Sequence, residues 1–347
     1  KRRWYCETWS YVGSTKCKTF QDTILFLFCV LCKLGGAMIT YYKTLNNRVK
    51  KIKQYEENCW INCITPDEDE IESLIDDFNI DPEFLKAALD AEESSHIDSE
   101  DGNTLIIIDV PIVQKTEKNI SYQTMPLGIM ITSKNVITIS LRENTVIGEI
   151  SDGVVKNINT ELSAQFVLNI ILRTAYKYLQ YLKQIDKISD HAEKELRRSM
   201  KNKELMQFLE VEKSLVYFSS SLKSNEATLK KIMRGRIIKL YEEDQDLLED
   251  VLIEVRQAIE MSSIQMNIIS STMDAFASII SNNLNIVMKI LASITLIFSI
   301  PTVISGFYGM NIGVHAMPLD NYWWFPWVLS GVLMLISGYV LKKKDML

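Results

Sequence analysis

The residues best suited to chemistry repeat along an apolar stretch that ends near residue 309. Their side chains are small, polar or flexible, they lie alternately three and four positions apart, and none is Leu, Ile, Val or Phe. They are Asn285, Met288, Ala292, Thr295, Ser299, Thr302, Gly306 and Gly309. This spacing puts them on one face of a helix, where amide and hydroxyl oxygens can hydrogen-bond water or a hydrated ion. We call this row of eight residues the polar stripe.

The helix that carries the polar stripe is otherwise apolar. Thirteen of the other 17 residues from 286 to 308 are bulky apolar or aromatic. A seam between packed helices also gathers small residues, but packing does not require Asn, Met and two Thr, so a water-contacting pore face is favoured. One helix encloses nothing, and a pore therefore needs several copies of the chain around an axis.

Two long stretches near the end of the chain carry no charge. Residues 290–319 and 321–341 contain no Asp, Glu, Lys or Arg. Each is long enough to cross a bilayer, which excludes a purely soluble protein. We expect a pore-lining transmembrane helix at 285–310, an external loop at 311–321 and a second transmembrane helix at 322–341.

Flanking residues predict the orientation of these spans. The second span opens with the aromatic run 322–327, which is typical of a membrane face, and it is followed by Lys342, Lys343 and Lys344. The positive-inside rule places these lysines, in a basic tail at 342–347, in the cytoplasm. Two spans return the chain to the side it left, so the residues before 285 are expected in the cytoplasm as well.

The residues before the spans predict two cytoplasmic regions. Residues 38–155 read as an α/β domain, and residues 156–284 as a helical stalk. Strands are predicted at 38–42, 60–64, 105–110, 124–131 and 136–140, and helices at 67–78, 82–90, 161–200, 203–233 and 241–309. The last helix runs into the first span and would be roughly 100 Å long at ~1.5 Å per residue.

Composition excludes several classes of protein. Residues 38–285 hold 40 acidic and 28 basic residues, a net charge of −12, which argues against a nucleic-acid partner and suits a protein that handles cations. The chain shows no Gly-rich phosphate loop, no Ser/His/Asp set and no His cluster, so we expect neither an enzyme nor a bound cofactor. Cys59 and Cys63 lack a second ligand pair and are expected to be buried, reduced thiols.

The first 37 residues are expected to be an upstream-translated extension. The first Met is Met38, and the preceding residues 34–37 can be encoded by a purine-rich stretch such as a bacterial ribosome-binding site. The apolar run at 23–32 is too short to span a bilayer.

The end of the first span carries a family signature. Tyr308-Gly309-Met310-Asn311 resembles the signature of the CorA family of magnesium channels, and the run 285–291, the sequence Ile300-Pro301-Thr302 and the lysine-rich tail agree with it. The resemblance covers about residues 38–347. It implies a homopentamer in the bacterial plasma membrane, with a funnel-shaped cytoplasmic assembly and the first span lining the pore.

The same resemblance assigns functional residues. Gly309, Met310 and Asn311 would form the selectivity filter, with Asn311 as its outer ring, while Met288 and Leu291 would form a hydrophobic gate. The transported ion would be Mg²⁺, with Co²⁺ and Ni²⁺ as alternatives. An amide ring suits Mg²⁺, which dehydrates reluctantly and can be selected through its bound water.

Two features depart from the family pattern. Some members carry a Glu after the Met-Pro of the outer loop, where this chain has Leu319 and Asp320. In well-known members a Glu-Asp pair meets an Asp of the neighbouring subunit to form a magnesium sensor; here Asp250 matches the partner, but Lys86 and Ala87 occupy the pair. Asp250 is therefore a candidate regulatory residue with altered partners.

Two alternatives stay open at this stage. A zinc-transporting relative would share the architecture, although such relatives tend to change the Met of the signature, and Met310 is present. A two-span scaffold protein anchored in the membrane would leave the polar stripe unexplained.

Overall fold

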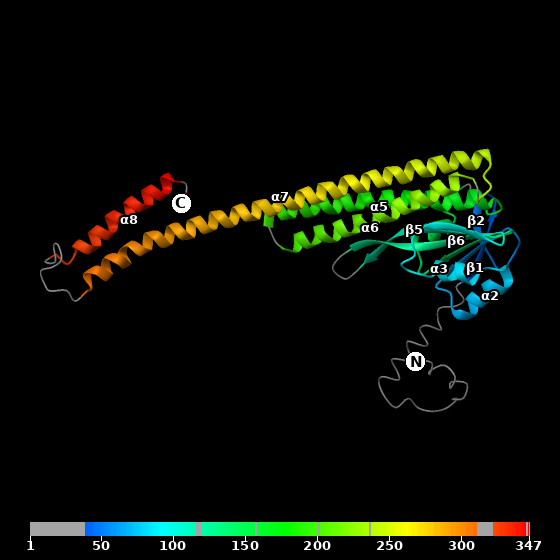
Figure 1. The fold of residues 1–347 in the computed structure, drawn as a ribbon, viewed down its shortest axis with the longest axis horizontal. Helices are drawn as coiled ribbons and strands as arrows, with labels where there is room; N and C mark the ends of the chain where they lie inside the picture. Colours follow the sequence, from blue (N-terminus) through cyan, green and yellow to red (C-terminus); the bar gives the residue numbers. More distant parts are fainter. Residues whose placement is uncertain are drawn as a thin grey trace, which may run out of the picture. The chain divides into compact units, whose positions relative to one another are not determined.

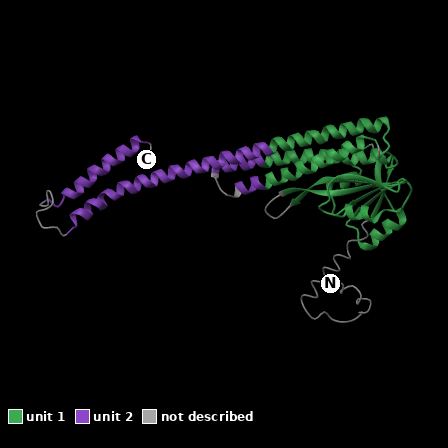
Figure 2. Ribbon diagram, in the orientation of Figure 1, with its two compact units in different colours: residues 1–188, 210–265 green, residues 189–209, 266–347 purple. Residues whose placement is uncertain are grey.

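The computed structural model describes residues 39–115, 120–156, 158–199, 202–235, 237–310, 322–344 and 346. The chain forms two compact units, which divide it at residues 188/189, 209/210 and 265/266 (Figure 2). The first unit holds the β-sheet and most of the cytoplasmic helices predicted from the sequence, and the second holds both predicted spans. The extension expected at 1–37 lies outside the described residues.

A seven-stranded sheet forms the framework of the first unit (Figure 1). Its order is β2-β1-β3-β7-β6-β5-β4, with β3 and β7 parallel and the other neighbours antiparallel. The strands are β1 (Ile39–Leu45), β2 (Arg48–Ile52), β3 (Trp60–Ile64), β4 (His96–Glu100), β5 (Asn103–Lys115), β6 (Ile120–Ile131) and β7 (Val136–Ser140). The predicted α/β architecture is thereby confirmed.

Short helices cover one face of the sheet. They are α2 (Glu68–Phe78) and α3 (Pro82–Ala88), and α4 (Thr145–Ser151) follows β7. Asp67 caps α2 in a reciprocal capping box with Glu70, which satisfies backbone donors at the start of the helix. Leu74 of α2 and Leu85 of α3 pack with the odd-numbered side chains of β3 in one hydrophobic core.

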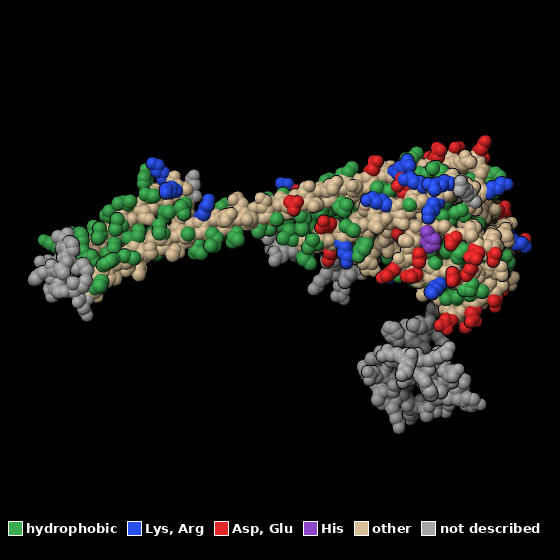
Figure 3. All heavy atoms as spheres, viewed as in Figure 1, with side chains coloured by type: hydrophobic (Ala, Val, Ile, Leu, Met, Phe, Trp, Pro, Cys, Tyr) green, Lys and Arg blue, Asp and Glu red, His purple; other side chains and the backbone are tan. Residues whose placement is uncertain are grey.

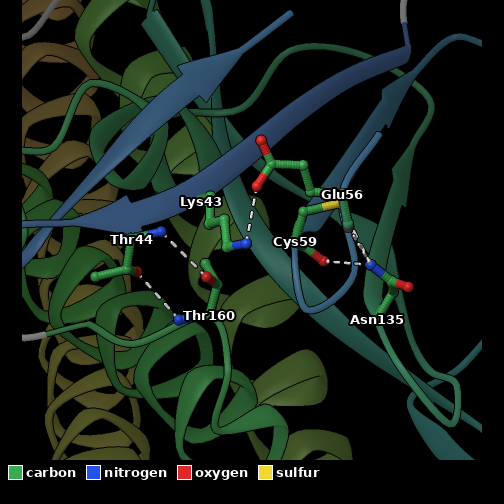
Figure 4. A network of polar contacts seen from close by, with 6 residues as sticks. All are labelled: Lys43, Thr44, Glu56, Cys59, Asn135 and Thr160. Carbon is green, nitrogen blue, oxygen red and sulfur yellow. Dashed lines mark hydrogen bonds and ion pairs between the residues drawn. The ribbon is translucent and has the colours of Figure 1, made fainter. Parts of the chain in front are cut away.

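Both thiols of that core are free and buried, as predicted. Burial raises the pKa of the Cys63 thiol to about 12, which keeps it protonated and unreactive at physiological pH. The amide of Asn135 donates to the carbonyl oxygen of Cys59 at 3.0 Å (Figure 4). Both cysteines therefore contribute to the packing of the core.

Two long helices lie against the sheet framework. They are α5 (Ser163–Ser199) and α6 (Asn202–Met233). The Trp60 ring, on the opposite side of β3 from the cysteines, stacks near Phe166 of α5 at 5.4 Å between centroids. Just before α5, Thr160 exchanges two 3.1 Å hydrogen bonds with Thr44 of β1 (Figure 4). These bonds hold the segment that leads into α5 against the sheet.

A buried polar cluster ties α6 to β5. Asn225 accepts a hydrogen bond from the Asp109 amide at 2.9 Å and donates to the Asp109 carbonyl oxygen at 2.9 Å. Burial raises the pKa of the Asp109 carboxyl, and hydrogen bonds from Ser221 and Ser95 partly offset this rise. Because buried polar groups are costly to leave unpaired, the cluster fixes the register of α6 on the sheet.

Helix α7 (Glu242–Tyr308) is 67 residues long. Its predicted start and end, 241 and 309, are each confirmed to within one residue. In the first unit, its Ser262 and Gln265 side chains donate to backbone carbonyls of Leu215 in α6 and Leu182 in α5. Helix α8 (Phe325–Lys343) begins three residues later than the predicted second span. Among the described residues, α7 and α8 are the two helices long and apolar enough to cross a membrane.

Three elements were not predicted from the sequence. Strands β2 and β4 form the two edges of the sheet, and α4 follows the loop after β7. The two edge strands are rich in charged and polar residues, which protects an exposed edge but hides the apolar signal of a strand. The tight turn Asp101-Gly102 was predicted, and both residues have positive φ values of 49° and 84°.

A glycine allows α3 to approach the sheet closely. A Cβ atom added to Gly128 of β6 would lie 2.5 Å from the Ala88 Cβ of α3. Carbon atoms in proteins do not approach so closely, so any side chain at this position must displace the helix or the strand.

We predict that Gly128→Ala lowers the free energy of unfolding by about 1–3 kcal/mol, the usual cost of overpacking. The measurement is thermal or denaturant unfolding of the purified chain. Gly148→Ala is the matched control, because a Cβ at Gly148 of α4 meets nothing within 4 Å. Adding Ala88→Gly to Gly128→Ala should recover part of the loss; equal stability of Gly128→Ala and Gly148→Ala would contradict the close contact.

Candidate functional site

The polar stripe forms an exposed line along the second half of α7. Each of its eight residues, from Asn285 to Gly309, is exposed in the single chain. The neighbouring apolar side chains are exposed as well, and they flank the stripe on both sides. On one flank lie Leu291, Ile294 and Phe298, and on the other Leu296, Val303 and Phe307.

Helix α8 packs on the opposite face of α7. Between residues 285 and 308, the α7 positions that are buried or half-buried are 293, 297, 300, 301, 304 and 308. At about 100° per residue, these positions lie roughly 180° around the helix from the polar stripe. The Tyr308 and Phe325 rings meet at 6.3 Å between centroids, and Ser293 donates to the Met346 carbonyl oxygen at 2.9 Å. The contact with α8 thus leaves the whole stripe uncovered.

The hydroxyl groups of the stripe point their hydrogens into the helix. Thr295 donates to the Leu291 carbonyl oxygen at 2.8 Å, Ser299 to Leu296 at 2.7 Å and Thr302 to Phe298 at 3.2 Å. A hydroxyl whose hydrogen is committed still offers lone pairs. The stripe therefore presents hydrogen-bond acceptors outward.

The predicted gate residues lie near the start of the stripe. Met288 and Leu291 are 55% and 56% exposed, so neither side chain is taken up by packing within the chain. They are three residues apart and therefore neighbours on the helix surface. Several copies around an axis could bring them together into apolar rings.

The predicted filter lies partly outside the described residues. Gly309 closes α7 with a 2.9 Å backbone hydrogen bond to the Ser305 carbonyl oxygen, and Met310 follows with 54% exposure. Asn311, Leu319 and Asp320 lie outside the described residues. The described part of the signature is at the end of α7, next to the contact between Tyr308 and Phe325.

Among the described residues, no hydrogen bond or ion pair joins the predicted regulatory residues. Asp250 is exposed on α7, Lys86 is exposed on α3 and Ala87 is half-buried. Across the described ranges, no group of three His, Cys, Asp or Glu residues could hold a metal ion. A regulatory role of Asp250 stays a prediction that requires a neighbouring subunit.

The sequence analysis missed the residues that hold α8 in place. Ser293 is 1% exposed, although it lies in a stretch of membrane helix that is otherwise mostly open in the single chain. Its position opposite the stripe marks the packed face of α7, where Ile297, Ile300 and Ile304 are no different in type from the apolar residues on the exposed flanks. The sequence therefore offered no separate signal for this face.

Two relatives of known name are similar in sequence to this chain. The cobalt/magnesium transport protein CorA of Methanocaldococcus jannaschii is 28% identical over 295 residues, which are 82% of this chain and 90% of that protein. The protein of the same name from Thermotoga maritima is 33% identical over 150 residues, 39% of this chain and 42% of the relative.

A solved structure shares the fold. The complete CorA magnesium transporter from Methanocaldococcus jannaschii superposes with a TM-score of 0.76 at 24% identity, covering 88% of this chain and 97% of that chain. The family model described as "CorA-like Mg2+ transporter protein" matches residues 55–343, which is most of the chain. The resemblance found in the sequence is confirmed: the chain belongs to the CorA-like Mg²⁺ transporter family.

Proposed function

We propose that this chain is one subunit of a homopentameric channel that admits Mg²⁺, and also Co²⁺ or Ni²⁺, into a bacterial cell through its plasma membrane. Members of the family transport divalent cations, and the Methanocaldococcus jannaschii relative is named for cobalt and magnesium transport. The observation that carries the proposal is the polar stripe of α7, uncovered on the face opposite α8.

The two flanks of the stripe fit a closed ring of subunits. Exposed apolar side chains lie on both sides of the stripe, and they differ between the two flanks. Two different flanks can form a head-to-tail contact, in which one flank of each copy packs on the other flank of the next copy. Repeated contacts of this kind close into a ring when the rotation between neighbouring copies divides a full turn. In that ring the stripes face the axis, α8 lies on the outside, and the family suggests five copies.

The stripe suits an ion that keeps its water. A hydrated Mg²⁺ presents only water hydrogens to its surroundings, because the water oxygens bind the metal. Outward acceptors at Thr295, Ser299 and Thr302 can receive those hydrogens without stripping the shell. Uncharged oxygens would also release the ion more readily than carboxylates do, as conduction requires.

Selection and closure are assigned to the two ends of the stripe. An Asn311 ring, with Gly309 and Met310, would hold the hydrated ion at the outer mouth. Apolar rings of Met288 and Leu291 would stop flow at the inner end by excluding water. A divalent ion gains about 4.6 kcal/mol per 100 mV of inside-negative potential, so uptake needs no ATP.

Orientation and regulation complete the proposal. The three consecutive lysines at the end of α8 favour a cytoplasmic C-terminus, which also places the α/β domain in the cytoplasm. Asp250 would contribute to a magnesium sensor between subunits. With Lys86 and Ala87 at the partner positions, that contribution would be weak, because an exposed ion pair adds little stability.

Ion flux into sealed vesicles tests the function directly. We expect purified protein, reconstituted with an inside-negative potential, to admit Mg²⁺ at a rate that rises with the potential. Co²⁺ and Ni²⁺ should compete with Mg²⁺, and Zn²⁺ should compete less. Empty vesicles are the control. No flux at any potential would favour a scaffold protein, and preferential Zn²⁺ flux would favour a zinc transporter.

Replacing Asn311 with Ala should reduce Mg²⁺ flux roughly tenfold or more, since one lost hydrogen bond to a charged group is worth about 1.5 kcal/mol. The oligomer should still assemble, as judged by size-exclusion chromatography. Asn267→Ala is the matched control, because Asn267 is an exposed amide on α7 that lies well before the first residue of the stripe. Wild-type flux from an assembled Asn311→Ala channel would remove this residue from the filter.

Replacing Met288 or Leu291 with Ser should leave the channel conducting at high internal Mg²⁺, where the wild type closes. A ring of hydroxyls stays wet and no longer stops ions. Leu335→Ser serves as the control, because Leu335 is 75% exposed on α8, the helix packed opposite the stripe. Full closure of both gate variants would place the constriction elsewhere on α7.

A further inference from the structure

The end of α8 is fastened to α7 by a hydrogen bond. After α8 the chain turns back, and the Met346 amide donates to the Leu341 carbonyl oxygen at 3.1 Å. The Met346 carbonyl oxygen then accepts from the Ser293 hydroxyl at 2.9 Å. Ser293 and Leu341 are both buried. The contact therefore fixes the C-terminal end of α8 at the level of residue 293 on α7.

This contact gathers four lysines at one level. Lys289 lies one helical turn before Ser293, and Lys342, Lys343 and Lys344 lie within four residues of Met346. All four side chains are exposed, and none has an ion-pair partner among the residues that the structure describes. We call these four residues the lysine collar. Figure 3 shows basic side chains gathered at the end of α8.

The lysine collar lies away from the polar stripe. Lys289 follows Met288 directly and so points about 100° away from it around α7. The other three lysines belong to the end of α8, which packs opposite the stripe. In the proposed ring they would lie on the outer side, where a bilayer surrounds the protein, and not in the path of the cations.

An apolar surface leads into the collar. Leu335, Ile336, Tyr339 and Val340 of α8 are 75%, 54%, 71% and 45% exposed. An exposed apolar surface that is followed by lysine ammonium groups is complementary to a phospholipid, whose acyl chain is followed by an anionic headgroup. With Asp345 counted, the collar and tail still carry a net charge of +3.

We propose that the lysine collar binds the headgroup of an anionic phospholipid in the cytoplasmic leaflet. The inference rests on the proposed function in that α7 and α8 lie in a bilayer, with the end of α8 on the cytoplasmic side and on the outside of the ring. A neighbouring chain is the competing source of negative charge, since residues 38–285 carry a net charge of −12. The exposed apolar surface beside the lysines favours the lipid, because acidic side chains leave that surface uncovered.

The test measures binding of short-chain lipids to the purified full-length channel in uncharged detergent. Dioctanoyl phosphatidylglycerol should bind and raise the unfolding temperature, and dioctanoyl phosphatidylcholine should bind at least tenfold more weakly. Changing Lys342, Lys343 and Lys344 together to Gln should weaken phosphatidylglycerol binding at least tenfold, since each lysine near an anionic surface contributes about fivefold. The corresponding triple change to Arg should retain binding.

Controls separate the lipid from other sources of charge. Lys50, Lys51 and Lys53 are also exposed, and changing them together to Gln should leave lipid binding unchanged. Equal binding of the two lipids, equal protection by inorganic phosphate, or unchanged binding after the triple Gln change would each overturn the proposal. Ion flux is measured separately, so a channel that conducts without lipid selectivity refutes only the collar, and lipid selectivity without flux refutes only the transport function.

Discussion

The circumference of α7 is the constraint on which the membrane part of this protein depends. A helix completes one turn every 3.6 residues, and in the proposed channel the circumference of this one helix must meet α8, neighbouring copies and water. The buried positions face α8, the bulky apolar side chains occupy the two flanks, and the polar stripe remains. A shift by one residue would turn the stripe by about 100° and put a flank where the stripe lies.

The same helix links two different surroundings. In the first unit, Ser262 and Gln265 of α7 donate to the backbones of α6 and α5, while in the second unit Thr295, Ser299 and Thr302 donate to their own helix. Where partner helices are present, polar side chains specify the packing. Beyond them, each of these hydroxyls finds its hydrogen-bond partner within its own helix, so that it needs no neighbour, as suits a span in a bilayer.

Much of the fold could be predicted from the sequence, because long apolar or periodic segments form the same helix or strand whatever packs against them. The apolar runs of β3 and β7 and the length of α7 were read correctly from the sequence. Strands β2 and β4 were missed because an edge strand needs only one covered face and carries charged residues on the other.

Within the site, the stripe was visible in the sequence as a pattern, but the face of α7 that packs on α8 was not. Only the contacts of Ser293 and Tyr308 reveal which face of α7 receives α8, because hydropathy alone does not distinguish lipid from a neighbouring helix.

The direction of the stripe hydroxyls has a further consequence for charge selection. An anion in water is held by hydrogen-bond donors, and it loses them when it enters a narrow passage. Between Ala292 and Gly306 the hydroxyl hydrogens of Thr295, Ser299 and Thr302 are already committed to backbone oxygens. Along this stretch chloride would therefore face hydroxyl oxygens that only accept hydrogen bonds, and it would find no donor to replace its lost water. In the proposed channel, such a passage would reject anions without a charged side chain between Ala292 and Gly306, and this part of the path would hold no side chain whose charge changes with pH.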